Sequence, residues 1–341
     1  MTKNSSLTIP YRRQSEYLPV DIAAMRPKDS YRQVVERRNY PIERLIEEHG
    51  CIPQDFLTDR PCPTCGSTRR ELELEKEGLS LVRCRDCDLV YVNPVFDEAH
   101  YKTIYQAEDY QAIVRDLGEA SHDYRVERFG KERVGIMARF LRSADGEAPR
   151  YLDIGCSTGF VVEAARDAGW QASGLDLNPS AVAFGRKRGL ELSEGGLDDH
   201  ALPEESFDAV SLFDVLEHIV NPGEILAKAL KLLKPGGIVF LYVPNYDSAS
   251  RLLLGANAVF IWPTHHLTYY TVETLGELLR RQGLEIEYTA TEGLDLIDYI
   301  WWQKEVEGRD VAGLEAIADK LQFFVNAGAY GKNLRAIGRK K

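Results

Sequence analysis

Short apolar segments alternate with amphipathic helical segments from about residue 150 to the end of the chain. Seven segments are predicted to be strands: Arg150–Gly155, Gln171–Leu177, Leu190–Glu194, Phe207–Phe213, Gly237–Pro244, Leu284–Thr291 and Asn333–Arg339. The intervening segments are predicted to be helices, several of which end at glycines such as Gly169, Gly189 and Gly283. Because parallel strands need a crossover between them, this alternation predicts a doubly wound α/β domain with a mainly parallel seven-stranded sheet.

Composition restricts the class of protein further. The chain has 341 residues, of which 44% are hydrophobic and 28% charged, which is typical of a globular protein and excludes a fibrous or disordered one. No apolar run approaches the roughly 18 residues of a membrane-spanning helix, and the polar first residues lack a signal-peptide core. A net charge of −11 disfavours nucleic acid as a partner. We therefore expect a soluble, cytoplasmic protein that acts on a small molecule.

Two Cys-x-x-Cys hooks stand in the first third of the chain, Cys62 with Cys65 and Cys84 with Cys87. They are separated by 18 residues that alternate like a hairpin, a spacing that is typical of a zinc site with four thiolate ligands. Four thiolates complete a tetrahedral shell, so the zinc is expected to be structural. The alternative is a pair of disulfides or free thiols.

Four regions are expected along the chain. Residues 1–60 form a partly helical N-terminal extension, with an amphipathic helix predicted from Arg32 to His49, and residues 61–95 form the zinc ribbon. Residues 96–145 are helical in pattern, and their tyrosines at 101, 105, 110 and 124, with His122, could roof a pocket as a lid. Residues 146–341 form the α/β domain, with a helical insertion at about 294–327.

A strand, a glycine turn and a helix follow one another from Tyr151 to Phe160. The two glycines, Gly155 and Gly159, permit close approach of a ligand to the backbone and to the start of the helix. The next strand ends in Asp176, an acid suited to a pair of ribose hydroxyls. Because the spacing is not the G-x-G-x-x-G that holds a pyrophosphate, a ligand with a ribose but no pyrophosphate fits better than a nicotinamide cofactor.

The motifs of this region carry a family resemblance. They are, in order, Asp153-x-Gly155-x-x-x-Gly159, Gly174-Leu175-Asp176, Leu202-Pro203 to Phe207-Asp208, Glu217-His218, Leu233-Lys234-Pro235-Gly236-Gly237 and Pro244-Asn245. By these motifs, the segment from about residue 127 to residue 341 resembles the class I S-adenosylmethionine-dependent methyltransferases. The resemblance implies that S-adenosylmethionine is the cofactor and that Asp176 holds its ribose. It implies further cofactor contacts from Asp153, Gly155, Cys156, Ser157, Gly159, Leu177, Leu197, Asp198 and Phe213.

A cluster of ionisable residues follows the fourth predicted strand, at the sheet edge where ligands of such folds lie. Asp214, Glu217 and His218 are spaced so that one helical turn would place all three on one face. In the first hypothesis His218 is a general base that Glu217 orients or polarises. In the second, the cluster holds a divalent cation such as Mg²⁺, and a later histidine from the pair His265-His266 completes the shell.

Both hypotheses have a counterpart among known families. The Glu217-His218 pair is similar to the acid–histidine pair of nucleotide-sugar C-methyltransferases, which also carry an N-terminal zinc module. The set Asp214, Glu217, His218 and His266 resembles the metal site of small-RNA 2′-O-methyltransferases and of quinol O-methyltransferases. We expect methyl transfer to a small polar acceptor, first of all a nucleotide-linked sugar or glycan unit. The alternatives are a Mg²⁺-assisted O-methyltransferase, an interaction protein without enzymatic activity, and histidines that only cap a turn or pack in the core.

Overall fold

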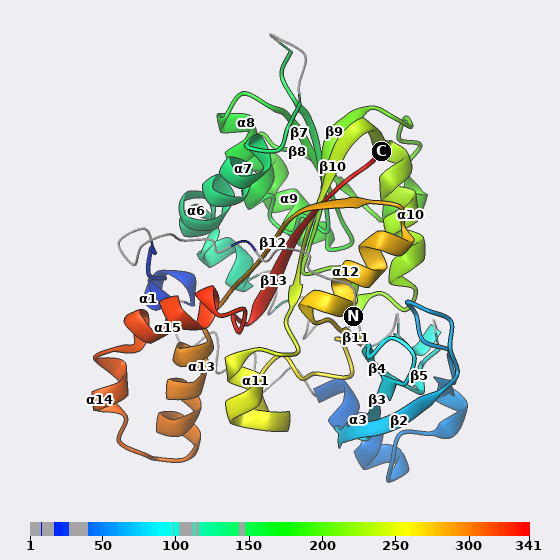
Figure 1. Ribbon diagram of the computed structural model, residues 1–341, viewed down its shortest axis with the longest axis vertical. Helices are drawn as coiled ribbons and strands as arrows, with labels where there is room; N and C mark the ends of the chain where they lie inside the picture. The colour runs from blue at the N-terminus through cyan, green and yellow to red at the C-terminus, as the bar shows by residue number, and fades with distance from the viewer. Residues whose placement is uncertain are drawn as a thin grey trace.

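The computed structural model describes residues 8, 17–26, 40–97, 99–101, 112, 116–142 and 147–341. Its main feature is a seven-stranded sheet in the order β12-β13-β10-β9-β6-β7-β8 (Figure 1). The strands are β6 (Arg150–Ile154), β7 (Gln171–Asp176), β8 (Glu191–Glu194), β9 (Phe207–Phe213), β10 (Leu233–Pro244), β12 (Glu285–Glu292) and β13 (Asn333–Arg339). Strand β13 runs antiparallel to both of its neighbours, and the other pairs are parallel. The predicted fold class is confirmed.

All seven predicted strands are present, and most of their ends lie within one residue of the prediction. The largest difference is β10, which begins at Leu233 rather than at Gly237. Leu233 pairs with Phe207 at the start of β9 before an irregularity interrupts the ladder, so the segment with Pro235 and two glycines lies inside the strand as a bulge. The Pro-Gly-Gly sequence at 235–237, which is typical of the end of a helix, therefore also forms a bulge near the beginning of β10.

Helices cover both faces of the sheet. On one face lie α7 (Lys131–Ala138), α8 (Phe160–Asp167) and α9 (Pro179–Lys187), and on the other α10 (Pro222–Leu232) and α12 (Val272–Arg281). Neighbouring residues of β6 alternate between these layers, since Tyr151 packs with the first group and Leu152 with the second. Asn178 caps the N-terminus of α9, because its side-chain oxygen accepts hydrogen bonds from the amides of Ser180 and Ala181.

The predicted ribbon is an antiparallel sheet of β2 (Arg70–Lys76), β3 (Leu79–Cys84) and β4 (Val90–Val92). A fourth strand, β11 (Thr268–Tyr269), belongs to the α/β part of the chain and pairs with β4. Beside this sheet lie α3 (Tyr40–His49), which forms the last part of the predicted helix, and the short pair β1 (Leu57–Thr58) and β5 (Val95–Phe96). The ribbon is therefore joined to the α/β domain by main-chain hydrogen bonds.

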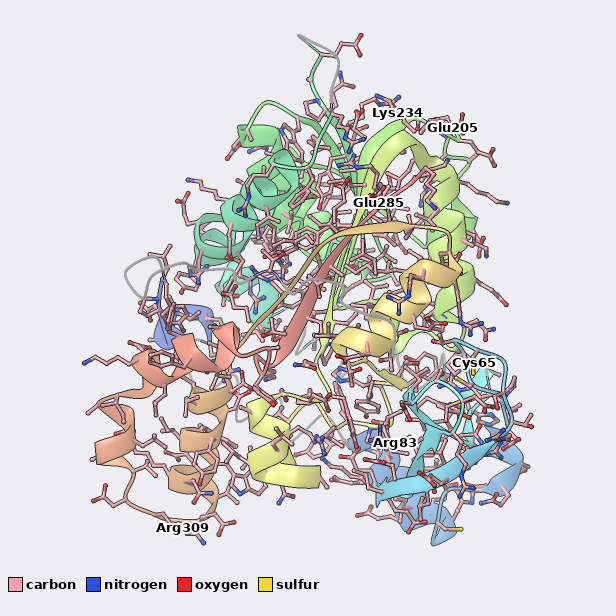
Figure 2. The ribbon with its side chains drawn as sticks, viewed as in Figure 1. Cys65, Arg83, Glu205, Lys234, Glu285 and Arg309 are labelled. Carbon is pink, nitrogen blue, oxygen red and sulfur yellow. The ribbon has the colours of Figure 1, made fainter. Side chains whose placement is uncertain are left out.

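The predicted helical insertion is present between β12 and β13. It consists of α13 (Asp295–Trp301), a π-helical turn (Trp302–Val306), α14 (Ala312–Glu315) and α15 (Ala318–Ala327). In Figure 2, Arg309 marks the tip of this insertion at the lower left, whereas Cys65 and Arg83 mark the ribbon at the lower right. The remaining helices are α1 (Ile22–Met25), α6 (His122–Arg125), a π-helical turn (Val126–Gly130) and α11 (Ala249–Leu254). Within the described residues, no helix is both long and apolar enough to cross a membrane.

Candidate active site

The glycine turn after β6 is tied to the end of β7. Gly155, Ser157 and Gly159 have positive φ angles of 76°, 50° and 82°, and Gly159 is the N-cap residue of α8. The amides of Ser157 and Asn178 donate to the two carboxylate oxygens of Asp176 at 2.7 and 2.8 Å. Asp176 is therefore held in place from both sides at the carboxyl edge of the sheet, where each oxygen can still accept from a hydroxyl.

Glycine at position 155 also has a packing reason. A Cβ built there would lie 2.4 Å from a methyl carbon of Val215, the residue that follows Asp214. The turn after β9 thus packs directly on the glycine turn, which brings the ionisable cluster next to the expected cofactor loop.

The other residues that the resemblance assigns to the cofactor differ in their surroundings. Leu177 is 57% exposed at the rim, Leu197 and Cys156 are buried, and Asp198 forms an ion pair with Lys228 at 2.7 Å. Phe213 packs edge-to-face against Phe240 and Tyr242 and lies under the guanidinium of Arg133. Asp153 is buried below the turn, where its carboxylate accepts from Ser211, and burial raises its pKa to about 7. The structure thus separates a rim, with Leu177 exposed and Asp176 half-buried, from a buried floor.

Described residues of the segment before the sheet contact the glycine turn and the loop after β9. His122 is buried and bridges Thr158 of the glycine turn and Glu163 of α8, at 2.8 Å each. Tyr101 donates to the main-chain oxygen of His218 at 2.8 Å. The predicted lid residues Tyr105 and Tyr110 lie outside the described residues.

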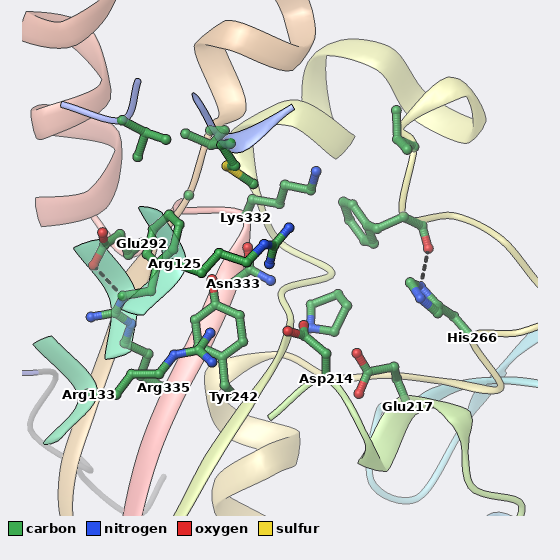
Figure 3. Close-up of a pocket in the computed structure, with 18 of the residues that line it drawn as sticks. Arg125, Arg133, Asp214, Glu217, Tyr242, His266, Glu292, Lys332, Asn333 and Arg335 are labelled. Carbon is green, nitrogen blue, oxygen red and sulfur yellow. Dashed lines mark hydrogen bonds and ion pairs between the residues drawn. The ribbon is translucent and has the colours of Figure 1, made fainter. Parts of the chain in front are cut away.

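A pocket of about 360 Å³ opens over the carboxyl ends of β9, β10 and β12 (Figure 3). Because β13 runs antiparallel, its first residues lie at the same edge and line the pocket as well. Its walls come from these strand ends, from α1, from the π-helical turn and α7, and from the loop that carries His266. Such a volume suits a small ligand.

Glu217, His218 and His266 converge at one side of the pocket. One carboxylate oxygen and one nitrogen of each ring lie within 4.8 Å of one another. Glu217 is 1% exposed, and neither of its carboxylate oxygens has a hydrogen-bond partner among the described residues. Burial and the neighbouring Asp214 raise the pKa of Glu217 well above its usual value. A buried carboxylate in this state is costly unless a proton or a cation accompanies it.

Both imidazoles are oriented by main-chain carbonyls. Nδ1 of His218 donates to the oxygen of His265 at 2.9 Å, and Nδ1 of His266 donates to the oxygen of Phe260 at 2.7 Å. A carbonyl oxygen only accepts, so the lone pair of each ring is on Nε2. Burial lowers the pKa of His218 to about 4, so this ring is neutral at pH 7. Imidazoles whose second nitrogen is anchored in this way are typical of metal ligands.

The local geometry differs from the predicted single helical turn. Only Leu216–His218 is helical, as a short 3₁₀ turn, and Asp214 precedes it with a positive φ of 56°. All three predicted residues nevertheless line the same pocket, and the carboxylates of Asp214 and Glu217 lie side by side (Figure 3). Of the two later histidines, His266 reaches the cluster, whereas the ring of His265 stacks on Trp262.

The ribbon holds this side of the pocket in place. Leu267, next to His266, donates its amide to the main-chain oxygen of Glu217, and its own oxygen accepts from Val92 of β4. Arg60 is buried, and its guanidinium donates to the main-chain oxygens of Val92, Val220 and Leu267. Arg60, two positions before Cys62, thus holds both the loop that follows His218 and the loop that carries His266.

The opposite side of the pocket is cationic, which the sequence analysis missed. It presents Arg26, Arg125, Arg133, Lys332 and Arg335 (Figure 3). Arg125 and Arg133 lie eight residues apart, in the helical segment just before β6. That spacing was a usable signal, since it puts two arginines on neighbouring sides of a helix that leads into the glycine turn.

The four cysteines of the hooks converge as predicted. Cys62 and Cys87 are 3.5 Å apart at their sulfurs, as are Cys65 and Cys84, and all four lie within 4.8 Å of one another. Sulfur separations of about 3.8 Å follow from tetrahedral zinc with Zn–S bonds near 2.3 Å. The residues therefore fit a closed tetrathiolate shell.

Sequence comparison identifies the family. Residues 125–289 match the family described as "Methyltransferase domain". The chain is 32% identical over 167 residues to the ubiquinone biosynthesis O-methyltransferase of Thiobacillus denitrificans, an alignment that covers 43% of this chain and 71% of that protein. This chain belongs to the class I S-adenosylmethionine-dependent methyltransferases. The recognised family and the predicted enzyme class are confirmed.

Other methyltransferases match over similar ranges. The enzyme of the same name from Xanthomonas campestris is 36% identical over 151 residues, 40% of this chain and 63% of that protein. A crystal structure of an S-adenosylmethionine-dependent methyltransferase from Archaeoglobus fulgidus is 18% identical, with a TM-score of 0.47, and covers 68% of this chain and all of that one. The ribbon, residues 61–95, lies outside the range matched by the family.

Proposed function

We propose that this methyltransferase transfers a methyl group from S-adenosylmethionine to a hydroxyl of a small acceptor that carries a second oxygen beside it, as in a catechol, quinol or vicinal diol. The observation that carries the proposal is the buried carboxylate of Glu217, whose oxygens have no hydrogen-bond partner among the described residues and which lies beside two anchored imidazoles. That arrangement fits a divalent cation held by Glu217, His218 and His266, with Asp214 adjacent.

The donor set bears on the choice of cation. Two imidazoles with one or two carboxylates favour Mn²⁺, Fe²⁺ or Zn²⁺ over Mg²⁺, which prefers oxygen ligands. When bound, such a cation lowers the pKa of a coordinated hydroxyl, so that the acceptor oxygen becomes a nucleophile near neutral pH.

The residues around the glycine turn fit S-adenosylmethionine. The two oxygens of Asp176 are suited to the ribose hydroxyls, and the exposed side chain of Leu177 offers an apolar surface to the adenine. Contact between Val215 and Gly155 sets the cluster beside the donor, so the chain positions the acceptor oxygen for in-line attack on the methyl carbon. The names of the relatives, ubiquinone biosynthesis O-methyltransferases, support methyl transfer to an oxygen atom.

The test measures cation dependence. Purified protein is treated with a chelator too weak to strip the cysteine cluster and is then assayed with S-adenosylmethionine and 4-methylcatechol or 3,4-dihydroxybenzoate. Turnover is expected to disappear and to return when Mn²⁺, Fe²⁺, Zn²⁺ or Mg²⁺ is added. Undiminished turnover in the chelator, with zinc retained in the cysteine cluster, would contradict the cation role.

A second candidate is methyl transfer to a nucleotide-linked sugar, with His218 as general base. The cationic side of the pocket favours it, because a diphosphate would neutralise those charges. A pKa of about 4 disfavours His218 as a base near neutral pH, however. In this case turnover with nucleotide sugars would persist in the chelator, which separates the two candidates.

We also propose that Cys62, Cys65, Cys84 and Cys87 hold a structural zinc ion. All four sulfurs are occupied as ligands in such a shell, so the ion would have no open position for chemistry. Its role would be to fold the ribbon that anchors the loop of His266. Metal analysis is expected to find one tightly held zinc per chain, lost in the Cys84→Ser variant.

A further inference from the structure

The cations that line the pocket are only partly balanced by carboxylates. Arg26 and Lys332 come from opposite ends of the chain, and both pair with the buried Asp298. Arg335 pairs with Glu132 and Glu292 instead, and Arg128 pairs with the same two acids. Within the described residues, the second group has two acids for two arginines, whereas the first has one acid for two cations.

Arg125 and Arg133 have no ion pair within the described part of the chain. Arg125 donates its Nε to Ser121 at 2.7 Å, and its guanidinium faces the pocket. Arg133 is 6% exposed and lies among the rings of Phe160, Phe213 and Tyr242 at 4.3–5.3 Å. These two arginines therefore add two charges to the cationic side of the pocket.

Asp214 is the acid that faces this group. Its charge interacts with Arg125, Arg133 and Lys332, although it forms no ion pair within 4.0 Å in the described structure. Among the described residues that line the pocket, there are two more cations than acids: the cations are Arg26, Arg125, Arg133, Lys332 and Arg335, and the acids are Asp214, Glu217 and Glu292. The cofactor does not remove this excess, because its one carboxylate is outweighed by its α-ammonium and its sulfonium. An excess therefore remains for the second substrate.

We propose that the acceptor is an anion, with a carboxylate or phosphate group that Arg125 and Lys332 receive while its hydroxyl faces Glu217, His218 and His266. This inference rests on the proposed function and adds the charge of the acceptor to it. The two sides of the pocket then bind the two ends of one molecule, and the charge pattern orients it.

The position of Lys332 relative to the sheet, and the direction in which Arg125 points, favour the acceptor over the cofactor. Lys332 and Asn333 stand at the start of β13, which β10 and β9 separate from β6 and its glycine turn. Three strand spacings of about 4.8 Å put these residues roughly 14 Å from β6. In Figure 3 the guanidinium of Arg125 points toward Lys332 and Asn333, over the ring of Tyr242. Both arginines also lie over the ring of Phe160, the first residue of α8, Arg133 at 5.3 Å and Arg125 at 6.0 Å.

The experiment compares two catechols that differ in charge, 3,4-dihydroxybenzoate and 4-methylcatechol, in the wild type and in Arg125→Gln. The wild type is expected to have a KM at least tenfold lower for the carboxylate. In Arg125→Gln this preference should fall to about twofold, through a higher KM for the carboxylate, while the KM for 4-methylcatechol and the Kd of S-adenosylhomocysteine stay within twofold. Arg142→Gln, which removes an exposed arginine far from the pocket, is the matched control.

Binding measurements separate this inference from the proposed function. Calorimetry with 3,4-dihydroxybenzoate, and separately with inorganic phosphate, is carried out on protein saturated with S-adenosylhomocysteine. Arg125-dependent binding without turnover would support the anion site and defeat the proposed O-methylation. If the ratio of the KM values for the two catechols were the same in the wild type and in Arg125→Gln, the anion site would be overturned. The anion site would also be overturned if Arg125→Gln raised the Kd of S-adenosylhomocysteine but kept the preference for the carboxylate. The same holds if the wild type bound neither anion at millimolar concentration.

Discussion

The two sides of the pocket are built in opposite ways. One side carries Glu217 and two imidazoles, held by main-chain hydrogen bonds that continue into the ribbon. The other carries long cationic side chains from the N-terminal segment, the helices before the sheet and the start of β13. Some of them pair with buried acids, as Arg26 and Lys332 do with Asp298, whereas Arg125 and Arg133 form no ion pair within the described residues.

The difference concerns how geometry is maintained. Main-chain hydrogen bonds fix the ligand positions of the first side closely, as a metal site requires. Long cationic side chains define a charge more than a position, which suits the recognition of an anion. Substitutions on the first side should therefore affect the chemical step, and those on the second should affect mainly binding.

Replacing Glu217 is expected to have the largest effect. Glu217→Gln keeps the volume of the side chain but removes its negative charge, so cation affinity should fall steeply and turnover by roughly a hundredfold to a thousandfold. Mn²⁺ binding, followed by electron paramagnetic resonance, and initial rates measure the two losses. Glu224→Gln, at an exposed position of α10, is the control. Wild-type rates and Mn²⁺ binding in Glu217→Gln would show that the carboxylate is not a ligand.

Arg60 tests whether the ribbon positions the first side. Arg60→Lys retains the charge but cannot reach Val92, Val220 and Leu267 together, and buried carbonyls without a donor cost about 1–3 kcal/mol each. We expect a lower melting temperature and a 10- to 100-fold weaker cation affinity, with little change in the Kd of S-adenosylmethionine. Arg85→Lys, in the exposed part of the ribbon, serves for comparison. An unchanged cation affinity would mean that the ribbon does not control the cluster.

Asp298 tests the second side. Burial alone would raise its pKa, but Lys332 and Arg26 outweigh burial and lower it. The carboxylate therefore contributes stability above its unfolded pKa of about 3.9, and this contribution is lost as the pH falls through the lower folded value. Asp298→Asn should be less stable by about 3 kcal/mol at pH 7, with only a few-fold change in kcat.

Urea unfolding from pH 2 to pH 8 checks the sign of this effect. The difference between the wild type and Asp298→Asn should be constant above about pH 5 and should shrink below about pH 4. Asp319→Asn, at an exposed position of α15, should show no such difference. A difference that grows in acid would refute the assigned role.

Leu177 is expected to show the smallest effect, since it touches neither side of the pocket. Leu177→Ala removes an exposed apolar surface at the cofactor rim, and the lost contact of about 1 kcal/mol should weaken S-adenosylmethionine binding about fivefold. Leu72→Ala removes an equally exposed leucine from β2 and should leave the Kd unchanged. Equal calorimetric titrations of the two variants would remove Leu177 from the adenine contact.

Local patterns in the sequence predicted most of the α/β domain. Alternating apolar residues located the strands to within a few residues, because side chains of β6 such as Tyr151 and Leu152 really do face two different helical layers. The spacing of the cysteine hooks predicted their convergence for a similar reason, since each hook is a single tight turn. The prediction of one helical turn from Asp214 to His218 was wrong, because Asp214 has a positive φ and the helical turn begins only at Leu216.

The sequence by itself determined the order of strands and helices, the glycine turn with Asp176, and the cysteine cluster, because each depends on residues near one another in the chain. Tertiary structure alone decided that β11 joins the ribbon, that His266 rather than His265 reaches Glu217, and that Arg26 meets Lys332 across Asp298. Those contacts join segments up to some 300 residues apart, so they depend on how the layers pack, and no local pattern records that.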